Sequence, residues 1–151
     1  MANTQAMTTS FKTELLTATH NFGTAPTRGT GTADTFYAAL YETTATLGAG
    51  TTAYTTSGEV TGAGYSAGGI AVTNATAPTS TGTTAYWTPS SSLMYTGVTL
   101  TTPFDTVLIY NQTQSNKAVS VHTFGSQTIT AGTFILTMPA NTNTTALLRL
   151  A

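Results

Sequence analysis

The stretch Asp105-Thr-Val-Leu-Ile-Tyr110 and the stretch Lys117-Ala-Val-Ser-Val-His-Thr-Phe124 flank a polar segment, Asn111-Gln-Thr-Gln-Ser-Asn116. Both flanks are short and rich in β-branched and aromatic residues, which favour strands. The polar segment between them has the composition of a longer hairpin loop. This hairpin decides the fold, because it makes the second half of the chain an antiparallel sheet.

The same pattern continues on both sides of this hairpin. We expect further strands at residues 35–41, 69–73, 83–88, 95–101, 127–130, 133–138 and 146–150. Tight turns are predicted at Gly125-Ser126 and at Ala131-Gly132. The sequence therefore predicts an all-β fold of about eight or nine strands, resembling a β-sandwich or jelly roll. Residues 1–151 would form a single domain with a polar amino-terminal arm over about residues 1–9.

One segment competes as a short helix. Ser10 can cap residues 11–17, where Phe11, Leu15 and Leu16 would share one face. A strand remains an alternative for this segment, because so short a helix must gain its stability from docking.

Some of the expected strands are apolar on both faces. In residues 35–41, Phe36 and Leu40 alternate with Tyr37 and Tyr41. Residues 107–110 and 134–138 show a similar character. Such strands favour a surface that is buried between subunits as well as a monomer core.

The composition excludes several classes of function. Charged residues make up 6% of the 151 residues, Thr accounts for 40, and the formal net charge is −1. The cations are scattered singly, so we expect no nucleic-acid partner: Lys12, Arg28, Lys117 and Arg149. No cysteine is present, no apolar run reaches the about 20 residues of a membrane helix, and the first residues do not resemble a signal peptide.

The side chains that could carry chemistry form no recognisable motif. They are His20, His122, Glu14, Glu42, Glu59, Asp34 and Asp105. No Gly-x-Ser-x-Gly or His-x-x-x-His spacing occurs, so we expect no catalytic residue, metal site or cofactor. Two of the acids, Glu59 and Asp34, are expected in turns, Asp105 at the start of a strand, and His122 on one face with Ala118, Ser120 and Phe124.

A set of segments in fixed order resembles a known group of proteins. These segments include Ser10-Phe-Lys-x-Glu-Leu-Leu16, Gly58-Glu-Val-x-Gly-x-Gly-Tyr65, Ala67-Gly-Gly69, Phe104-Asp-x-Val-Leu-Ile-Tyr-Asn111 and Phe124-Gly-Ser-Gln-Thr-Ile-Thr-Ala-Gly-Thr-Phe134. In this respect the chain is similar to small virion structural proteins of tailed bacteriophages, of the capsid decoration or cement type. None of these segments is a chemical motif.

The resemblance implies a non-enzymatic capsid cement protein, made in the cytoplasm of the bacterial host and placed on the exterior of the virion. Its partners would be copies of itself, as a homotrimer, and the major capsid protein, with the oligomer stabilising the head. Neck, tail or fibre components are the alternative, with a possible glycan-binding surface that uses aromatic rings such as Trp87. The candidate oligomer or capsid contacts are Phe11, Leu15, Tyr37, Tyr41, Tyr65, Trp87, Tyr110 and His122.

Overall fold

The fold is all-β, as the sequence predicts. A computed structural model describes residues 2–22, 32–73 and 76–151. Strands account for 45% of the structure and helix for 6%, with eight strands in two antiparallel sheets and one short helix. Most of the loop that would contain Arg28 lies outside the described residues.

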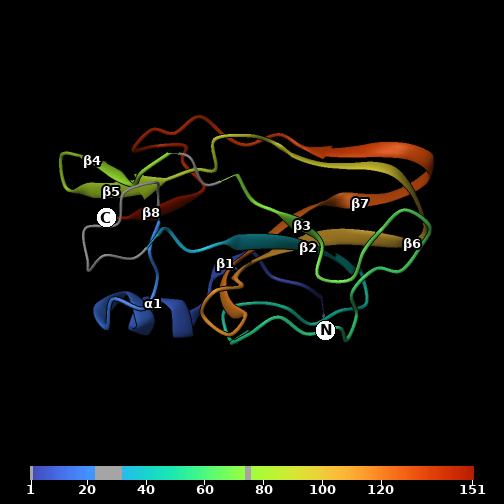
Figure 1. The fold of residues 1–151 in the computed structure, drawn as a ribbon, viewed down its shortest axis with the longest axis horizontal. Coiled ribbons are helices and arrows are strands. Elements are labelled where there is room, and N and C mark those ends of the chain that lie inside the picture. The colour runs from blue at the N-terminus through green and yellow to red at the C-terminus, as the bar shows by residue number, and fades with distance from the viewer. Residues whose placement is uncertain (1, 23–31, 74–75) are drawn as a thin grey trace.

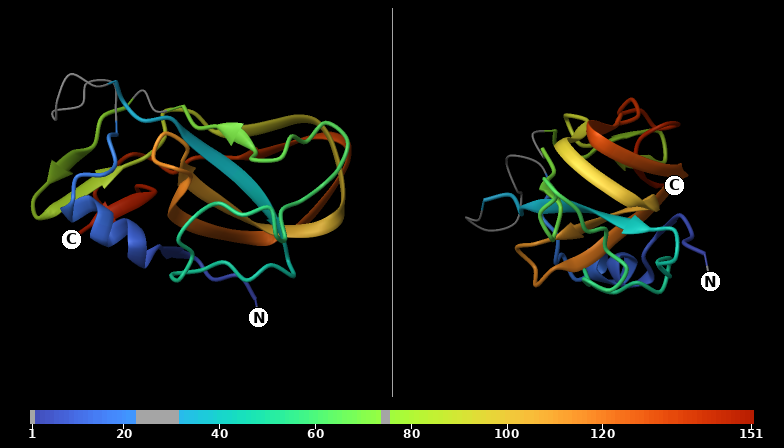
Figure 2. Two further views of the ribbon diagram at one scale, coloured as in Figure 1. Left: turned by 60° about the horizontal axis from the view of Figure 1, so that its bottom comes forward. Right: turned by 90° about the vertical axis from the view of Figure 1, so that its right-hand side faces the viewer.

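The larger sheet has five strands in the order β1-β7-β6-β2-β3 (Figure 1). Their bounds are Ala6–Met7 for β1, Lys117–Leu136 for β7, Leu93–Asn111 for β6, Phe36–Glu42 for β2 and Ile70–Ala71 for β3. The smaller sheet has the order β4-β5-β8, with bounds Thr79–Thr81, Thr84–Trp87 and Leu148–Leu150. It lies at the same end of the molecule as the helix α1, Thr9–Leu16 (Figures 1 and 2).

The long β6–β7 ribbon is the main element of the fold, and its loop follows residue 111, where the sequence predicts a hairpin. The two expected turns further along are wrong, because β7 runs without interruption through Gly125-Ser126 and Ala131-Gly132. The pairing of β6 with β7 shifts register at several positions, so residues that would form turns stay within the strand. Ala131 is one of them and has a positive φ of 46°. Such irregularities bend a strand without ending it.

Strand β2 is buried on both faces within this chain. Phe36 and Leu40 face the larger core cluster, whereas Ala39 and Tyr41 face a second, smaller cluster. The second cluster is closed by residues of the connection after β2, including Leu47. The chain therefore covers both faces itself, and the doubly apolar pattern of β2 does not require a partner.

The glycine-rich connection before β3 packs its backbone against the sheet. A Cβ on Gly69 would lie 1.8 Å from the carbonyl oxygen of Ala38, and one on Gly62 would lie 2.0 Å from that of Thr99. Any side chain at either position would collide with the sheet. The absence of a side chain at these glycines therefore allows the close approach of the connection to the sheet.

Helix α1 begins earlier than the sequence predicts, and its cap is Thr8 instead of Ser10. The Thr8 side chain accepts a hydrogen bond from the Phe11 amide. Phe11 is buried, whereas Leu16 is 89% exposed. The expected shared face is wrong for Leu16, because five positions turn a helix by about 140° and carry that side chain away from Phe11.

The amino-terminal arm is part of the folded body. Ala6 and Met7 pair with Val121 and Ser120 of β7. The Asn3 side chain accepts a hydrogen bond from the Leu47 amide at 2.9 Å. Residues of the predicted polar arm therefore pack against the body of this chain.

Candidate functional site

Five polar side chains form a network that involves helix α1: Glu14, His20, Asp34, Asn111 and Lys117. His20 Nε2 lies 2.8 Å from Glu14 Oε2, and the His20 Nδ1 atom lies 2.9 Å from Asn111 Nδ2. Asn111 also donates to Asp34 Oδ2 at 2.7 Å, and Lys117 Nζ donates to Glu14 Oε1 at 2.6 Å. Burial is the largest influence on the imidazole and lowers the pKa of His20.

This network holds segments together. It joins α1 and the residues after it to the β6–β7 hairpin, because Glu14 and His20 contact residues about a hundred positions later in the chain. Both nitrogens of His20 are occupied, and Asn111 is fully buried. A catalytic histidine needs a free nitrogen within reach of a substrate, so the arrangement suits a structural role.

A second buried polar cluster surrounds Glu59. Its carboxylate accepts hydrogen bonds from the Tyr54 hydroxyl at 2.6 Å, the Tyr65 hydroxyl at 2.8 Å and the Gly68 amide at 2.7 Å. Glu59 is 6% exposed. The sequence places Glu59 in a turn, and it misses that this acid fixes the connection between β2 and β3 to the sheet.

The hydroxyl groups of two neighbouring tyrosines donate hydrogen bonds to backbone carbonyls. The Tyr110 hydroxyl donates to the Gly68 carbonyl at 2.9 Å, and the Tyr95 hydroxyl donates to the Ala38 carbonyl at 2.7 Å. Burial, followed by the Glu59 charge, raises the pKa of Tyr110 to about 12. Burial also raises the pKa of Tyr65 well above its usual range. These phenols stay protonated and act as hydrogen-bond donors.

A serine and a histidine line a hollow between β1 and β8. Ser120 Oγ lies 2.9 Å from His122 Nε2, and the hollow has a volume of about 560 Å³. Burial lowers the pKa of His122 to about 4. The imidazole is therefore a weak base, and no carboxylate is bonded to it among the described residues. The pair lacks the orienting acid that activates a catalytic serine.

The face that His122 occupies differs in one respect from the prediction. His122 pairs with Val107 and Ser120 pairs with Ile109, and both partners face the larger core cluster. Ala118 belongs to the second cluster on the opposite face. A register shift between Ile109 and Tyr110 changes the alternation, so Ala118 does not share the face of His122.

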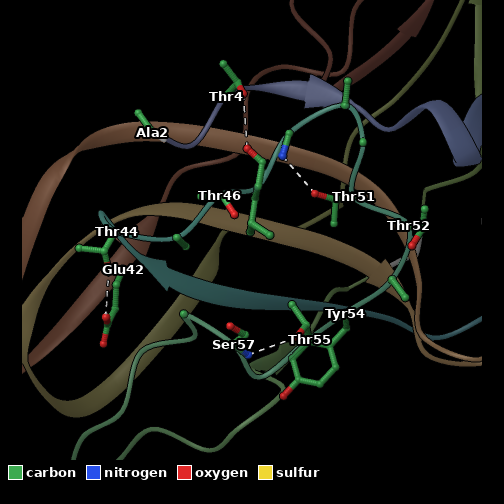
Figure 3. A pocket seen from close by; sticks show the side chains of 17 residues that line it. Ala2, Thr4, Glu42, Thr44, Thr46, Thr51, Thr52, Tyr54, Thr55 and Ser57 are labelled. Carbon is green, nitrogen blue, oxygen red and sulfur yellow. Dashed lines mark hydrogen bonds between the residues drawn. The ribbon is translucent and has the colours of Figure 1, made fainter.

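A large hollow follows β2 and is lined by most of residues 42–58 together with Ala2 and Thr4 (Figure 3). Its volume is about 950 Å³, and its wall consists mainly of Thr, Ala and Gly. Glu42 is the single charged residue that lines it. We call this concave surface the 42–58 hollow. It is open and rich in hydroxyl groups, and it holds no second acid or histidine.

A smaller groove between α1 and the small sheet is almost entirely apolar. Its volume is about 90 Å³. It is lined by Met7, Phe11, Leu15, Phe22, Pro78, Ala85, Tyr86, Trp87, Leu148 and Leu150. Within the described residues, no group of three or more His, Cys, Asp or Glu side chains could hold a metal ion.

The structure separates the eight candidate contact residues into two groups. Four are buried in the chain's own core, with exposures of 0–3%, and have no surface to offer a partner: Phe11, Tyr41, Trp87 and Tyr110. The other four are partly exposed and belong to α1, to β2, to the connection before β3 and to β7: Leu15, Tyr37, Tyr65 and His122. The eight do not form one surface, because large aromatic side chains serve a core as well as an interface.

Of the aromatic rings available for glycan binding, Trp87 and Tyr95 are enclosed. Trp87 is 2% exposed, and its indole nitrogen donates to the Thr76 carbonyl at 2.8 Å. Tyr95 is 2% exposed. Tyr54 stacks on Tyr110 with ring centroids 4.8 Å apart and is only partly exposed.

Asp105 also differs from its expected place. It lies inside β6 instead of at a strand start, because the predicted strands 95–101 and 105–110 form one continuous strand. Its carboxylate accepts hydrogen bonds from the Asn3 side chain at 3.0 Å and from the Thr106 hydroxyl at 2.7 Å.

Comparison with known proteins finds no relative of this chain: no family model, no curated protein and no solved structure matches it. Among the described residues, no helix has the length and apolar character needed to span a membrane.

Proposed function

We propose that this chain is a non-enzymatic structural protein of a tailed-phage virion, a cement protein that binds the assembled head as an oligomer and stabilises it. The observation that carries this proposal is that the buried acid and histidine side chains hydrogen-bond to other parts of the chain. Glu59 is saturated by three donors from the connection that it holds, and His20 is bonded through both nitrogens.

The segments that carry the resemblance support the same conclusion. The stretch from Gly58 to Gly69 supplies Glu59, two of its three donors and the glycines that approach the sheet. Residues 104–111 form the largely buried carboxyl-terminal part of β6. Sequence features that specify a rigid shape are what a protein acting through adhesion requires.

The low charge of the chain also supports adhesion over substrate processing. Only two ion pairs occur in the described residues, and both involve Glu14. A surface dominated by hydroxyl and methyl groups forms contacts that depend weakly on salt. Such contacts would tolerate the ionic changes that a virion meets outside its host.

The decisive experiment measures the copy number and position of the chain in purified virions. We expect gel densitometry to show an abundant band that co-fractionates with heads separated from tails. A few copies that travel with necks or tails would contradict the cement role and favour the tail or fibre alternative.

A reconstitution experiment tests stabilisation directly. Heads that lack the chain would be heated with and without purified protein, and we expect the protein to raise the temperature at which packaged DNA is released. Denatured and refolded protein serves as the control for recovery of binding. Heads that neither bind the protein nor gain thermal resistance would contradict the proposal.

A further inference from the structure

The charged side chains of this protein divide into those that are buried or in an ion pair and those that are neither. Glu14 pairs with Lys117, whereas Asp34 and Glu59 are buried and hydrogen-bonded. Four other charges are neither buried nor in an ion pair within the described residues. These are Lys12, Arg149, Glu42 and Asp105.

The two signs lie at different ends of the molecule. Lys12 is on α1 and Arg149 is on β8, and both elements lie at the end where β2 begins (Figure 1). Glu42 is the last residue of β2, which runs away from that end. Asp105 lies beside Glu42, because the Asn3 amide donates both to the Glu42 carbonyl and to the Asp105 carboxylate.

The cationic end carries a convex apolar surface. Lys12 and Leu16 are one helical turn apart, so they lie on the same outward side of α1. Leu16 is 89% exposed, more than any other large apolar residue described. Phe11 faces the core on the opposite side of the helix. We call this surface, made by Lys12 and Leu16, the α1 ridge.

The anionic end carries a concave surface of matching character. The 42–58 hollow has a volume of about 950 Å³ and walls of small and methyl-bearing residues such as Ala49 and Thr46. Figure 3 shows Glu42 and Thr44 together at one side of the hollow. The hydroxyl groups dominate this hollow, but the methyl groups of its Thr and Ala residues can contact an apolar side chain, and its one carboxylate can pair with a cation.

We propose that the α1 ridge of one copy docks in the 42–58 hollow of a second copy, with Lys12 beside Glu42. Charge complementarity and the pairing of a convex with a concave surface select a second copy as the occupant. Because the two surfaces differ, each copy offers both, and repeated contacts of this kind form a ring when the rotation between copies closes and a filament when it does not. This inference deepens the proposed function by naming the contact that forms the oligomer.

Charge reversal tests the proposed pair in purified protein without capsids. We expect Lys12→Glu and Glu42→Lys each to weaken self-association at least about tenfold, because like charges then face each other. The double variant Lys12→Glu/Glu42→Lys restores an attractive pair and should return the dissociation constant to within about threefold of the original. Sedimentation equilibrium measures all four proteins.

A matched pair of apolar variants tests the ridge. Leu16 and Ile135 are both exposed, on α1 and on β7 respectively. We expect Leu16→Ser to weaken self-association at least about tenfold and Ile135→Ser to leave it unchanged. Circular dichroism and urea unfolding confirm that each variant folds as the parent does.

Three results would overturn this inference: a monomeric parent protein, a double variant that stays as weak as the single variants, or equal effects of Leu16→Ser and Ile135→Ser. The test is separate from that of the proposed function. A chain that self-associates through this contact but is absent from heads would retain the contact and lose the cement role. A monomeric chain that is abundant on heads would retain the cement role and contradict the proposed contact.

Discussion

At the scale of single residues, Gly69 is the position at which the backbone tolerates least change. Its φ is +76°, and an added Cβ would lie 1.8 Å from the Ala38 carbonyl oxygen. Both the left-handed conformation and the collision oppose any side chain. The close approach of the connection before β3 to strand β2 therefore depends on this glycine.

We expect Gly69→Ala to reduce the free energy of unfolding by about 3 kcal/mol or more. Gly50→Ala is the matched control, because nothing lies within 4 Å of an added Cβ there. Urea denaturation would measure both variants, and Gly50→Ala should change stability by less than about 1 kcal/mol. Equal stability of the two variants would contradict the close approach.

Glu59 is the second residue whose loss should be costly. Replacing it by Gln turns one of its oxygens, which accept from Tyr54, Tyr65 and Gly68, into a donor that faces other donors. We expect Glu59→Gln to lower the free energy of unfolding by about 2–3 kcal/mol. Glu42→Gln should change it by less than about 0.5 kcal/mol, because among the described residues the Glu42 carboxylate accepts only from the Thr44 hydroxyl. Urea denaturation at neutral pH distinguishes these outcomes.

His122 gives the protein a defined pH dependence. Burial holds its pKa at about 4 in the folded chain, below the ordinary value of 6.5. The unfolded chain therefore binds the proton first as the pH falls, and stability decreases between about pH 6.5 and pH 4. The loss from this residue is at most about 3 kcal/mol.

Urea midpoints measured from pH 7 to pH 4 would test the effect of His122. We expect His122→Gln to flatten the pH dependence of stability, although His20, whose pKa is also lowered by burial, retains a contribution of the same sign. An NMR titration should show no protonation of His122 above about pH 5. A midpoint near 6.5 would contradict the burial of its ring.

At the scale of elements, the start of helix α1 is tied to the sheet by one side chain. The Thr8 hydroxyl accepts from the Phe11 amide at 3.3 Å and donates to the Ala118 carbonyl at 3.0 Å. Thr8 is fully buried. The cap of the helix and its anchor on β7 are therefore the same group.

We expect Thr8→Val to reduce the free energy of unfolding by about 1–2 kcal/mol, because it removes the cap and leaves a buried carbonyl without this donor. Thr8→Ser should retain most of the stability. Thr13→Val on the exposed side of α1 is the control, and thermal unfolding by circular dichroism measures the set. A stable Thr8→Val protein would show that the cap does not hold the helix in place.

The elements also show how far sequence reasoning reaches. Local alternation correctly predicts β2, β5, β8 and the hairpin after residue 111, because strand propensity and turn residues act over a few positions. It divides β6 and β7 into shorter strands, because bulges and turns use the same residue types. It also misses β1, whose pairing with β7 spans more than a hundred positions.

The candidate site was less accessible to prediction for a related reason. A tyrosine is equally suited to a core and to an interface, so Tyr41 and Tyr110 carried no local sign that this chain would bury them itself. The role of Glu59 depends on donors brought together by the fold. The signal in the sequence is an acid that lies between two glycines, Gly58 and Gly62, in a chain with few charges.

At the scale of the whole molecule, both sheets share the larger core cluster. Trp87 of β5 contacts Phe22 at 4.8 Å and Phe36 of β2 at 6.1 Å between ring centroids. Phe36, Trp87 and Leu148 belong to the same cluster. The small sheet therefore has no separate core among the described residues.

We expect the two sheets to unfold in one transition. Trp87 is the single tryptophan of the chain, so its fluorescence reports the small sheet, whereas far-ultraviolet circular dichroism is dominated by the longer strands. The two signals should give the same urea midpoint. Separate midpoints would show that the small sheet is an independent unit.

The segment that covers the second face of β2 also determines where a neighbouring protein can attach. Residues of this chain cover that face. A partner therefore contacts loops and the outer strands β1, β3, β4 and β8 instead of the centre of the sheet. Binding at these outer strands and loops would leave the conformation of the central strands unchanged. The proposed capsid partner would then bind without altering the core of this protein. Amide exchange in β2 should accordingly be the same in the free and the attached protein.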